Sequence, residues 1–408
     1  MTEKEKGKIL ILELQGKLLS ILICHNRIIA VRAEKPKKDE GCRIGSIYVG
    51  KVQNISGNIG AAFVEIQKGV LAFLPLAETK AAVLVNRKPD GTLKAGDELL
   101  VQVVREPQKT KQAGISTKLS LAGSYVVIEN RKAVDRNAAA SSVSMLRLSS
   151  RMSAEYRHLY KEQESLQKIS GHLGLIIRTN ADNLPDISPV LMEAQMLAEK
   201  MEHILEIGDK RVCFSCLHRS GPEYLSFIRN CYQSEYDEII TDRKEIYDML
   251  LSDERTKNCP IRYYEDKMLP LHKLYSVETR IQELLSRRVW LQSGAYLVIE
   301  PTEALTAIDV NTGKYEAGKN KEATYLKINL EAAEAIAWAL RARNLSGIIL
   351  VDFINMQKKE HNEQLTAYMK ALLQKDTVPA YVVDITGLGL MEITRKKQHK
   401  SFAEQMAE

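Results

Sequence analysis

The stretches Leu305-Thr-Ala-Ile-Asp-Val-Asn311 and Gly347-Ile-Ile-Leu-Val-Asp-Phe353 decide the fold of the C-terminal part of the sequence. Each is a short apolar run that predicts a buried β-strand, and each ends in one carboxylate, Asp309 or Asp352. A buried strand that ends in an anion indicates an edge of the sheet that attracts positive charge. Mg²⁺ takes one or two carboxylates together with waters and phosphates. Side by side, these strands would form a candidate phosphodiester-cutting centre.

The segments around these strands alternate between strand and helix patterns. Further strands are expected at residues 295–300 and 380–384. Residues 325–343 carry apolar side chains on one helical stripe, with Ser346-Gly347 just past the end, and residues 360–375 predict a second helix. Alternation of this kind predicts an α/β layer structure over residues 284–408.

Composition places the chain among ordinary globular proteins, with 408 residues, 45% hydrophobic and 27% charged. This length predicts roughly two to four compact units rather than one core. The net charge of +6 is mild and fits a solvated surface as well as an affinity for anions. No apolar run approaches the length of a membrane span, and residues 1–7 lack the apolar core of a signal peptide. A cytoplasmic location is therefore expected.

Six cysteines are scattered along the sequence and are expected to be reduced. Cys213 and Cys216, with His218 nearby, resemble one half of a zinc site. A structural zinc site normally needs four ligands in two clusters, and the sequence has no second pair. The alternation over residues 211–218 instead favours a strand with small buried thiols.

Short β-rich runs dominate the first 120 residues. Residues 8–14, 17–24 and 27–31 predict a meander of hairpins. Five further strands are expected at residues 46–52, 60–66, 70–74, 98–105 and 114–119. Five short strands in a segment of this length suit a barrel of the oligonucleotide-binding type.

Aromatic and basic residues on this barrel indicate RNA binding. Phe63 and Phe73 fall on consecutive strands, where exposed rings would stack on unpaired bases. The alternative is that both rings belong to the core, which is also the simpler interpretation of either ring taken alone. Five basic residues would attract the nucleic-acid backbone: Lys51, Arg105, Lys109, Lys111 and Lys118.

Residues 121–220 predict a third unit, of α+β type. Strands are expected at residues 124–128 and 174–178, and residues 189–207 have the apolar spacing of an amphipathic helix. Residues 224–275 mix strand and helix signals.

Eight motifs in order make the sequence closely resemble the ribonuclease E/ribonuclease G family. The similarity covers nearly the whole chain and is strongest in the C-terminal unit. The motifs are Gly45-Ser-Ile-Tyr-Val-Gly-Lys51, Ala61-Ala-Phe-Val-Glu65, Phe73-Leu-Pro-Leu76, Leu305-Thr-Ala-Ile-Asp-Val-Asn311, Asn329-Leu-Glu-Ala-Ala333, Leu340-Arg-Ala-Arg-Asn-Leu345, Val351-Asp-Phe-Ile354 and Gly389-Leu-Met-Glu-Ile-Thr-Arg395.

The resemblance implies a multidomain α/β and α+β fold. Residues 1–42 and 217–283 would be the two parts of an RNase H-like subdomain. An S1-type OB barrel at 43–120 and a 5′-sensor subdomain at 121–216 would be inserted between them. A DNase I-like catalytic subdomain would follow at 284–408.

The resemblance also implies a Mg²⁺-dependent endoribonuclease, with Mn²⁺ as a substitute metal. Such an enzyme cuts single-stranded, A/U-rich RNA in ribosomal or transfer RNA processing or in messenger decay, and leaves 5′-monophosphate and 3′-hydroxyl ends. Asp309 and Asp352 match the family's metal ligands, and Asn311 matches the polar partner beside them. Asn311 follows Asp309 by two residues, so both side chains point to the same side of the strand. For either aspartate alone, the alternative is a strand-end cap.

The family's 5′-phosphate sensor is matched only in part. A basic residue expected shortly after Asp376 is missing, and Thr377-Val-Pro-Ala380 stands there instead. The sequence therefore predicts weak discrimination between 5′-monophosphate and 5′-hydroxyl RNA. The residues that do match are an Arg-Thr pair suited to gripping a phosphate and two neighbours: Arg178, Thr179, Gly123 and Val127.

Two more departures concern metals. Asn355 replaces the second acidic residue usual after Asp-Phe-Ile, which removes one charge. The sequence after Arg395 lacks the Cys-Pro-x-Cys zinc-link of many members, so no structural zinc is expected and a homo-oligomer would form without it. The basic run at 395–400 would contact RNA phosphates or simply be solvated.

A catalytically weak RNA-binding or regulatory protein of the same fold is the alternative interpretation. The intact set of Asp309, Asn311 and Asp352 favours the enzyme. A generic S1-type RNA chaperone would leave the C-terminal α/β unit unexplained.

Overall fold

The computed structural model describes residues 6–35, 43–88, 90–107, 111–130, 145–182, 184–253, 256, 259–313 and 321–407. The chain divides into two compact units. One unit comprises Met1–Lys38 and Glu223–Glu408, and the other comprises Asp39–Pro222. Within the described ranges, no helix combines the length and the apolar character needed to cross a membrane.

A five-stranded sheet in the first unit takes strands from two distant parts of the chain. Its order is β15-β14-β1-β2-β3, and β14 runs parallel to β1. The predicted meander of three hairpin-connected strands is confirmed. The strands are β1 (Gly7–Leu14), β2 (Lys17–Cys24), β3 (Arg27–Glu34), β14 (Tyr236–Thr241) and β15 (Ile261–Tyr263).

Alternate residues of β1 pack on opposite faces of this sheet, as the two-residue period of a strand requires. Ile9 and Ile11 join one core, and Leu10 and Leu12 join another. The first core contains residues of α4 (Glu223–Asn230) and α5 (Lys244–Ser252). The 3-10 turn η3 (Gln233–Glu235) lies between these two helices in the sequence. The second contains residues of α6 (Leu271–Leu274), α7 (Val277–Leu285) and α10 (Phe402–Ala407).

The second unit contains a closed barrel in which all five predicted strands are present. The order is β4-β5-β6-β8-β7, and β7 pairs back with β4 to close it. The elements are β4 (Ile47–Ser56), β5 (Ala61–Gln67), β6 (Val70–Pro75), the 3-10 turn η1 (Leu76–Ala81), β7 (Glu98–Arg105) and β8 (Ala113–Ser116).

The strand predicted over residues 211–218 is wrong for most of its length. β13 covers only Cys216–His218 and pairs with β4. Phe214 has a φ of 71° and the Ser215 N–H donates to the Val212 carbonyl at 3.2 Å, so the chain turns here. Cys216 is exposed and Cys213 is half-buried, which contradicts the expectation of buried thiols.

The rest of the second unit is a four-stranded sheet with three helices. The predicted helix over 189–207 is confirmed as α3 (Ser188–Gly208). Apolar residues of α3 share one core with the sheet and with β4 of the barrel. The other elements are β9 (Ser120–Ala122), β10 (Val126–Glu129), β11 (Leu146–Leu148), α1 (Ala154–Lys161), α2 (Glu164–His172), β12 (Gly174–Ile177) and the 3-10 turn η2 (Thr179–Ala181).

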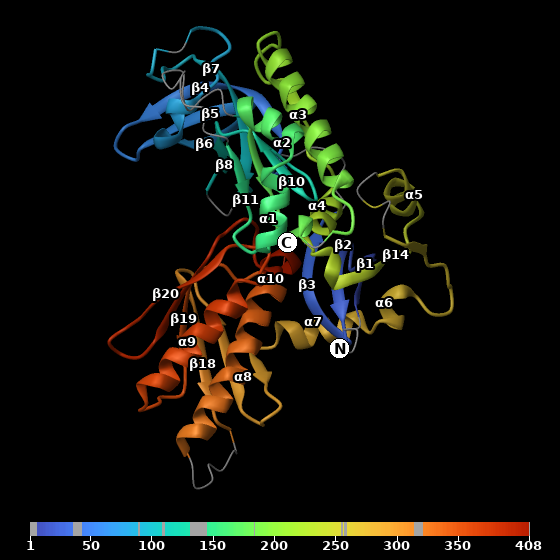
Figure 1. Ribbon diagram of the computed structural model, residues 1–408, viewed down its shortest axis with the longest axis vertical. Helices are drawn as coiled ribbons and strands as arrows, with labels where there is room; N and C mark the ends of the chain where they lie inside the picture. The colour runs from blue at the N-terminus through green and yellow to red at the C-terminus, as the bar shows by residue number, and fades with distance from the viewer. Residues whose placement is uncertain are drawn as a thin grey trace. The chain divides into compact units, whose positions relative to one another are not determined.

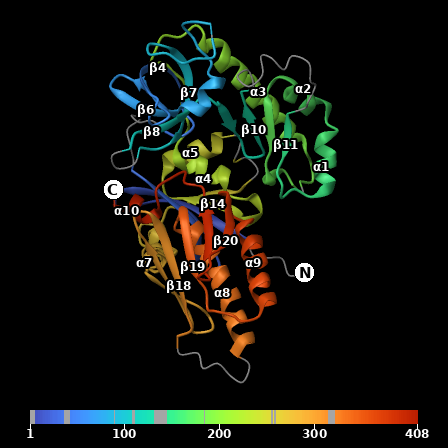
Figure 2. The ribbon, with the colours of Figure 1, turned by 90° about the vertical axis from the view of Figure 1, so that its left-hand side faces the viewer.

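The C-terminal α/β layer is confirmed as a six-stranded sheet with the order β16-β17-β18-β19-β21-β20. Two helices, α8 (Lys321–Ala342) and α9 (Lys359–Leu373), lie along it (Figures 1 and 2). The strands are β16 (Arg288–Trp290), β17 (Tyr296–Pro301), β18 (Leu305–Asn311), β19 (Gly347–Asp352), β20 (Ala380–Ile385) and β21 (Met391–Arg395). β16 and β21 were not expected from the sequence patterns.

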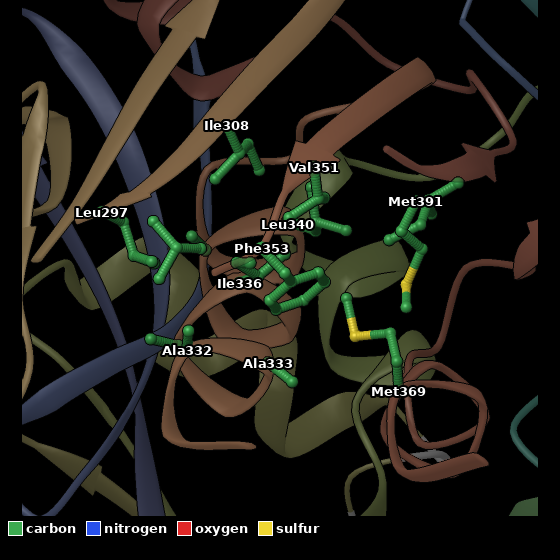
Figure 3. Packing of buried hydrophobic residues seen from close by; sticks show 14 of the residues in the cluster. Leu297, Ile308, Ala332, Ala333, Ile336, Leu340, Val351, Phe353, Met369 and Met391 are labelled. Atoms are coloured by element: carbon green, nitrogen blue, oxygen red, sulfur yellow. The ribbon is translucent and has the colours of Figure 1, made fainter. Parts of the chain in front are cut away.

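Only one face of this sheet is covered by the two helices. The covered face contributes Leu297, Ile308, Val351 and Met391, all nearly inaccessible to solvent. Figure 3 shows these side chains against Ala332, Ala333, Ile336 and Leu340 of α8 and Met369 of α9. The opposite face of the same strands carries the half-buried and exposed side chains.

The basic run at 395–400 is not uniformly solvated. Arg395 is 2% exposed, and its guanidinium pairs with Asp376 at 2.8 Å. Its Nη1 also donates to Asn344 Oδ1 at 2.9 Å. Arg395 therefore has a structural role, while Lys396 and Lys397 are exposed.

His399, at the end of this run, makes the stability of the protein depend on pH. Burial and the nearby Arg32 and Arg395 guanidiniums lower the pKa of His399 to about 3, outweighing Glu223 at 3.8 Å. Between that value and the ordinary histidine pKa near 6.5, the unfolded chain binds a proton that the native state does not. This group therefore contributes stability that is lost as the pH falls from about 6.5 toward 3, by up to about 1.4 kcal/mol per pH unit.

Replacing His399 by Gln should flatten this dependence. Urea unfolding at pH 7 and pH 5 measures it as the difference between the two unfolding free energies. His25→Asn is a matched control, because His25 is exposed in a left-handed turn that asparagine tolerates. An unchanged pH difference in His399→Gln would contradict the assignment.

Candidate active site and RNA-binding surfaces

Asp309 and Asp352 lie directly opposite each other on two adjacent parallel strands, β18 and β19. Both side chains are exposed, whereas the flanking Ile308, Val310 and Val351 are buried on the other face. Neighbouring strands are about 4.8 Å apart, so the two carboxylates lie within reach of a single cation. The expected meeting of the two acid-tipped strands is confirmed.

Asn311 lies beside this pair. Its Nδ2 donates a hydrogen bond of 2.7 Å to a carboxylate oxygen of Asp309, which confirms that both side chains point to the same side of β18. The turn that follows Asn311 packs tightly against the turn before β17. At Gly313, with φ 63°, a Cβ atom would lie 2.5 Å from the Gly294 carbonyl oxygen, so this approach requires glycine.

A buried asparagine on α8 fixes the backbone just beyond Asp352. Asn329 is fully buried; its Nδ2 donates to the Ile354 carbonyl at 2.8 Å and its Oδ1 accepts from the Ile354 N–H at 3.0 Å. Both polar groups of the side chain are thereby satisfied inside an apolar core. Asn329 belongs to one of the motifs that carry the family resemblance, but the sequence patterns predicted no role for it. The available signal was one amide among the apolar positions of a helix.

The donor set fits Mg²⁺ better than a metal that needs a full cage of side chains. No group of three or more His, Cys, Asp or Glu side chains suited to holding a metal occurs in the described part of the chain. Two opposed carboxylates with open positions suit Mg²⁺, which retains several waters and binds substrate phosphates. Asn355 is exposed, and its Oδ1 lies 3.4 Å from where a Cβ on Gly389 would be, so it faces the β20–β21 turn.

Phe63 and Phe73 form a pair on the outside of the barrel. They are direct neighbours on β5 and β6, with ring centroids 6.3 Å apart and planes at 80°. Both rings are half-buried, while the adjacent Ala62, Val64 and Ala72 are fully buried. The alternative that both rings belong to the core is therefore wrong.

The row of side chains that contains these rings continues across two more strands. Phe73 is paired with Gly114 on β8, and Gly114 with Arg105 on β7. Because Gly114 has no side chain, the Arg105 side chain approaches it to within 3.2 Å of a Cβ position. An aromatic pair followed by a guanidinium combines stacking with phosphate attraction.

The other basic candidates are dispersed. Lys118 is exposed just beyond β8, and its backbone N–H donates to Ser116 Oγ at 3.0 Å. Lys111 is exposed and Lys51 is half-buried. Lys109 lies outside the described residues.

The residues matched to the 5′-phosphate sensor lie close together. The Arg178 guanidinium donates to the Gly123 carbonyl, and the Thr179 and Ser149 hydroxyls are 2.8 Å apart. Val127 lies on β10, between Ile176 of β12 and Ala122 of β9. The structure therefore brings Gly123, Arg178 and Thr179 to one end of this sheet.

A buried carboxylate from α3 accepts hydrogen bonds from the backbone just after Gly123, and the sequence patterns did not predict it. Glu193 is 9% exposed and accepts hydrogen bonds from the N–H groups of Ser124, Tyr125 and Val126 at 2.7, 2.7 and 3.0 Å. A Cβ atom on Gly123 would lie 2.2 Å from its carboxyl carbon. The possible signal was a lone acid among the apolar positions of the 189–207 helix.

Comparisons with known proteins agree with the architecture. A model of the Ribonuclease E/G family matches residues 120–398, and a model of the S1 RNA binding domain matches residues 42–118. The chain is 31% identical to ribonuclease G of Escherichia coli (strain K12) over 379 residues, covering 88% of this chain and 73% of that protein. It is 30% identical to ribonuclease G of Salmonella typhimurium (strain SL1344), with the same coverage.

A third relative gives the same result. The chain is 31% identical to ribonuclease E of Nostoc sp. (strain PCC 7120) over 379 residues, covering 89% of this chain and 52% of that protein. A family match over most of the chain, combined with an S1 domain on the closed barrel, leaves one conclusion. The chain belongs to the ribonuclease E/G family.

Proposed function

We propose that the protein is a metal-dependent endoribonuclease that cuts single-stranded, A/U-rich RNA and leaves 5′-monophosphate and 3′-hydroxyl ends. The observation that carries the proposal is the opposed pair of exposed carboxylates, Asp309 and Asp352, with Asn311 hydrogen-bonded beside them. Its relatives are ribonucleases, and the S1 domain supports RNA binding. In this proposal the barrel retains the RNA and the six-stranded sheet carries the chemistry.

Asp309 and Asp352 would hold one Mg²⁺ ion, or Mn²⁺ as a substitute. When bound, such an ion polarises a phosphoryl oxygen and lowers the pKa of a coordinated water. Asn311 positions Asp309 by donating to its carboxylate, and the carbonyl oxygen of its amide would orient a water or accept from a ribose hydroxyl. Asn329 fixes the chain after Asp352 and so limits the freedom of that carboxylate.

Within this proposal the five-stranded sheet corresponds to an RNase H-like subdomain and the six-stranded sheet to a DNase I-like catalytic subdomain. The joining of β1–β3 with β14 and β15 in one sheet supports a subdomain split by an insertion. The extension of unit two over Asp39–Pro222 supports an insertion that contains both the barrel and the sensor.

Product analysis tests the proposed function. The purified protein is incubated with a 3′-labelled A/U-rich RNA that has a 5′-hydroxyl end, and with a duplex of the same sequence, each with Mg²⁺ or with a chelator. We expect internal cuts in the single strand alone, only with metal, and products that a 5′-monophosphate-dependent exonuclease accepts without prior treatment. RNA binding without cutting at any metal concentration would favour the catalytically weak alternative.

The response to the 5′ end should be weak. Glu193 already occupies three backbone N–H groups beside Gly123, and its charge opposes a terminal phosphate near Arg178. Thr377 and Val378 supply no cation where the family pattern has one. We expect the cleavage rates of 5′-monophosphate and 5′-hydroxyl versions of one RNA to differ by less than about tenfold, or 1.4 kcal/mol. A much larger preference for the monophosphate would contradict this prediction.

A further inference from the structure

The open face of the six-stranded sheet carries an aromatic pair next to the carboxylates. The packing of the core does not explain why these two rings lie there. Trp290 of β16 and Tyr296 of β17 are direct neighbours, with ring centroids 5.1 Å apart. Trp290 is 64% exposed, although Val289 and Leu291 on either side of it are buried in the core. A large aromatic ring that buries so little surface indicates a binding role more than a packing role.

Strand register connects this pair to the site. Tyr296 is paired with Asn311, and Val298, two residues further along β17, is paired with Asp309. Side chains at paired positions share a face of the sheet. Trp290, Tyr296 and Asn311 therefore form one row across three strands, immediately beside the row that contains Asp309 and Asp352.

A guanidinium completes the surface. Arg288 is exposed on β16, paired with Val298, and its guanidinium carbon lies 5.2 Å from the centroid of the Tyr296 ring. It thus belongs to the row of Asp309 on the same face. A stacked ring pair with an adjacent cation matches the two parts of a nucleotide, an apolar base and a phosphate.

We propose that Trp290, Tyr296 and Arg288 form a base-stacking subsite that holds an unpaired nucleotide of the substrate RNA beside the carboxylates. Trp290 is two strands away from β18, a distance of about 10 Å. The stacked base would then be roughly one or two nucleotides from the phosphate that is cut. The proposal rests on the proposed ribonuclease function, and it adds a contact on the catalytic sheet to those on the barrel.

Tryptophan fluorescence tests the contact without any cleavage. The protein has two tryptophans, and Trp338 is half-buried, with its Nε1 donating to the Ile28 carbonyl at 2.7 Å and the Arg27 guanidinium at 3.6 Å from its ring. An A/U-rich single-stranded RNA of about ten nucleotides is added to Asp309→Asn protein in a chelator, and binding is followed by anisotropy. We expect quenching with Asp309→Asn and none with the double variant Asp309→Asn, Trp290→Phe.

Cleavage by otherwise wild-type protein gives a second readout. We expect Trp290→Ala to lower kcat/KM by about tenfold, mostly through KM, and Trp290→Phe to restore most of the loss. With wild type, an abasic nucleotide at one position near the cut should lower the rate, and Trp290→Ala should lose that sensitivity. Tyr381→Ala is the matched control, because Tyr381 is equally exposed at 64% but lies on β20 at the far edge of the sheet.

The outcomes separate the two proposals. If wild type cuts RNA but Trp290→Ala cuts equally well and binding leaves Trp290 fluorescence unchanged, the subsite is wrong and the ribonuclease function stands. If wild type cuts no RNA, the proposed function is wrong, and quenching specific to Trp290 still identifies a stacking site. Equal losses in Trp290→Ala and Tyr381→Ala would show a general effect of removing aromatic surface and would overturn the subsite.

Discussion

Replacing Asp309 by Asn should reduce RNA cleavage at least about a thousandfold while RNA binding persists. The change removes one of two charges that would hold the metal, and a bound metal supplies several kcal/mol of transition-state stabilisation. The shape of the side chain is preserved and the residue is exposed, so the fold should survive. Binding should tighten slightly, because a carboxylate that repels phosphates is lost. Single-turnover cleavage and anisotropy with the same RNA measure the two effects.

A control variant and a melting-temperature measurement test whether the effect is specific to Asp309. Asp384→Asn removes an exposed carboxylate from β20, two strands beyond β19, and should leave the rate near that of wild type. The two carboxylates face each other as like charges, which destabilises the pairing of β18 with β19. A cation that binds between them only in the folded state stabilises the folded protein. Mg²⁺ should therefore raise the melting temperature of wild type and of Asp384→Asn but not of Asp309→Asn. Equal cleavage by wild type and Asp309→Asn would rule out this metal site.

Replacing Gly123 by Ala should have the largest effect on stability. The new methyl group would lie 2.2 Å from the carboxyl carbon of Glu193. The carboxylate would have to leave the three N–H groups of Ser124, Tyr125 and Val126, and hydrogen bonds to a charged group are worth about 1.5–3 kcal/mol each. We expect a loss of about 3 kcal/mol or more. Hydrogen exchange at these three amides and urea unfolding measure it.

Two variants isolate the cause of this loss. Gly171→Ala lies on α2 in the same unit, where a Cβ meets nothing within 4 Å. It should change stability by no more than about 1 kcal/mol. In a Glu193→Ala background the carboxylate with which the new methyl group would clash is absent. Gly123→Ala should then lower the free energy of unfolding only slightly further. An undiminished cost in that background would mean that the backbone of the loop, rather than the carboxylate, resists the methyl group.

The elements with strong periodicity could be predicted from the sequence. The meander at 8–31 and the helix at 189–207 each have a clear apolar period, and both are present as β1–β3 and α3. β16 was missed because three residues are too short for a period to register, and it is the strand that carries Trp290. The strand expected at 211–218 failed because Phe214 adopts a left-handed turn, which alternation alone cannot reveal.

In the candidate site too, local sequence patterns predicted some residues and missed those that depend on distant partners. Asp309 and Asp352 could be predicted because each carboxylate ends an apolar run, and their register places them opposite each other. Arg395 was misjudged because a basic residue near a terminus gives no local sign of a buried partner 19 residues away at Asp376. Glu193 was missed for the same reason, since its three N–H partners lie 67 to 69 residues earlier in the chain.

The alternation along β18 joins the core and the candidate site in one strand. Ile308 and Val310 face the helices, and Asp309 and Asn311 face the open side. Inserting a single residue within this strand would turn every later side chain over, exposing apolar groups and burying a carboxylate. Relatives that keep a working site should therefore vary in the loops beside β18 and preserve its length. Substitutions intended to change RNA specificity should therefore be made on β16 and β17, with the length of β18 left unchanged.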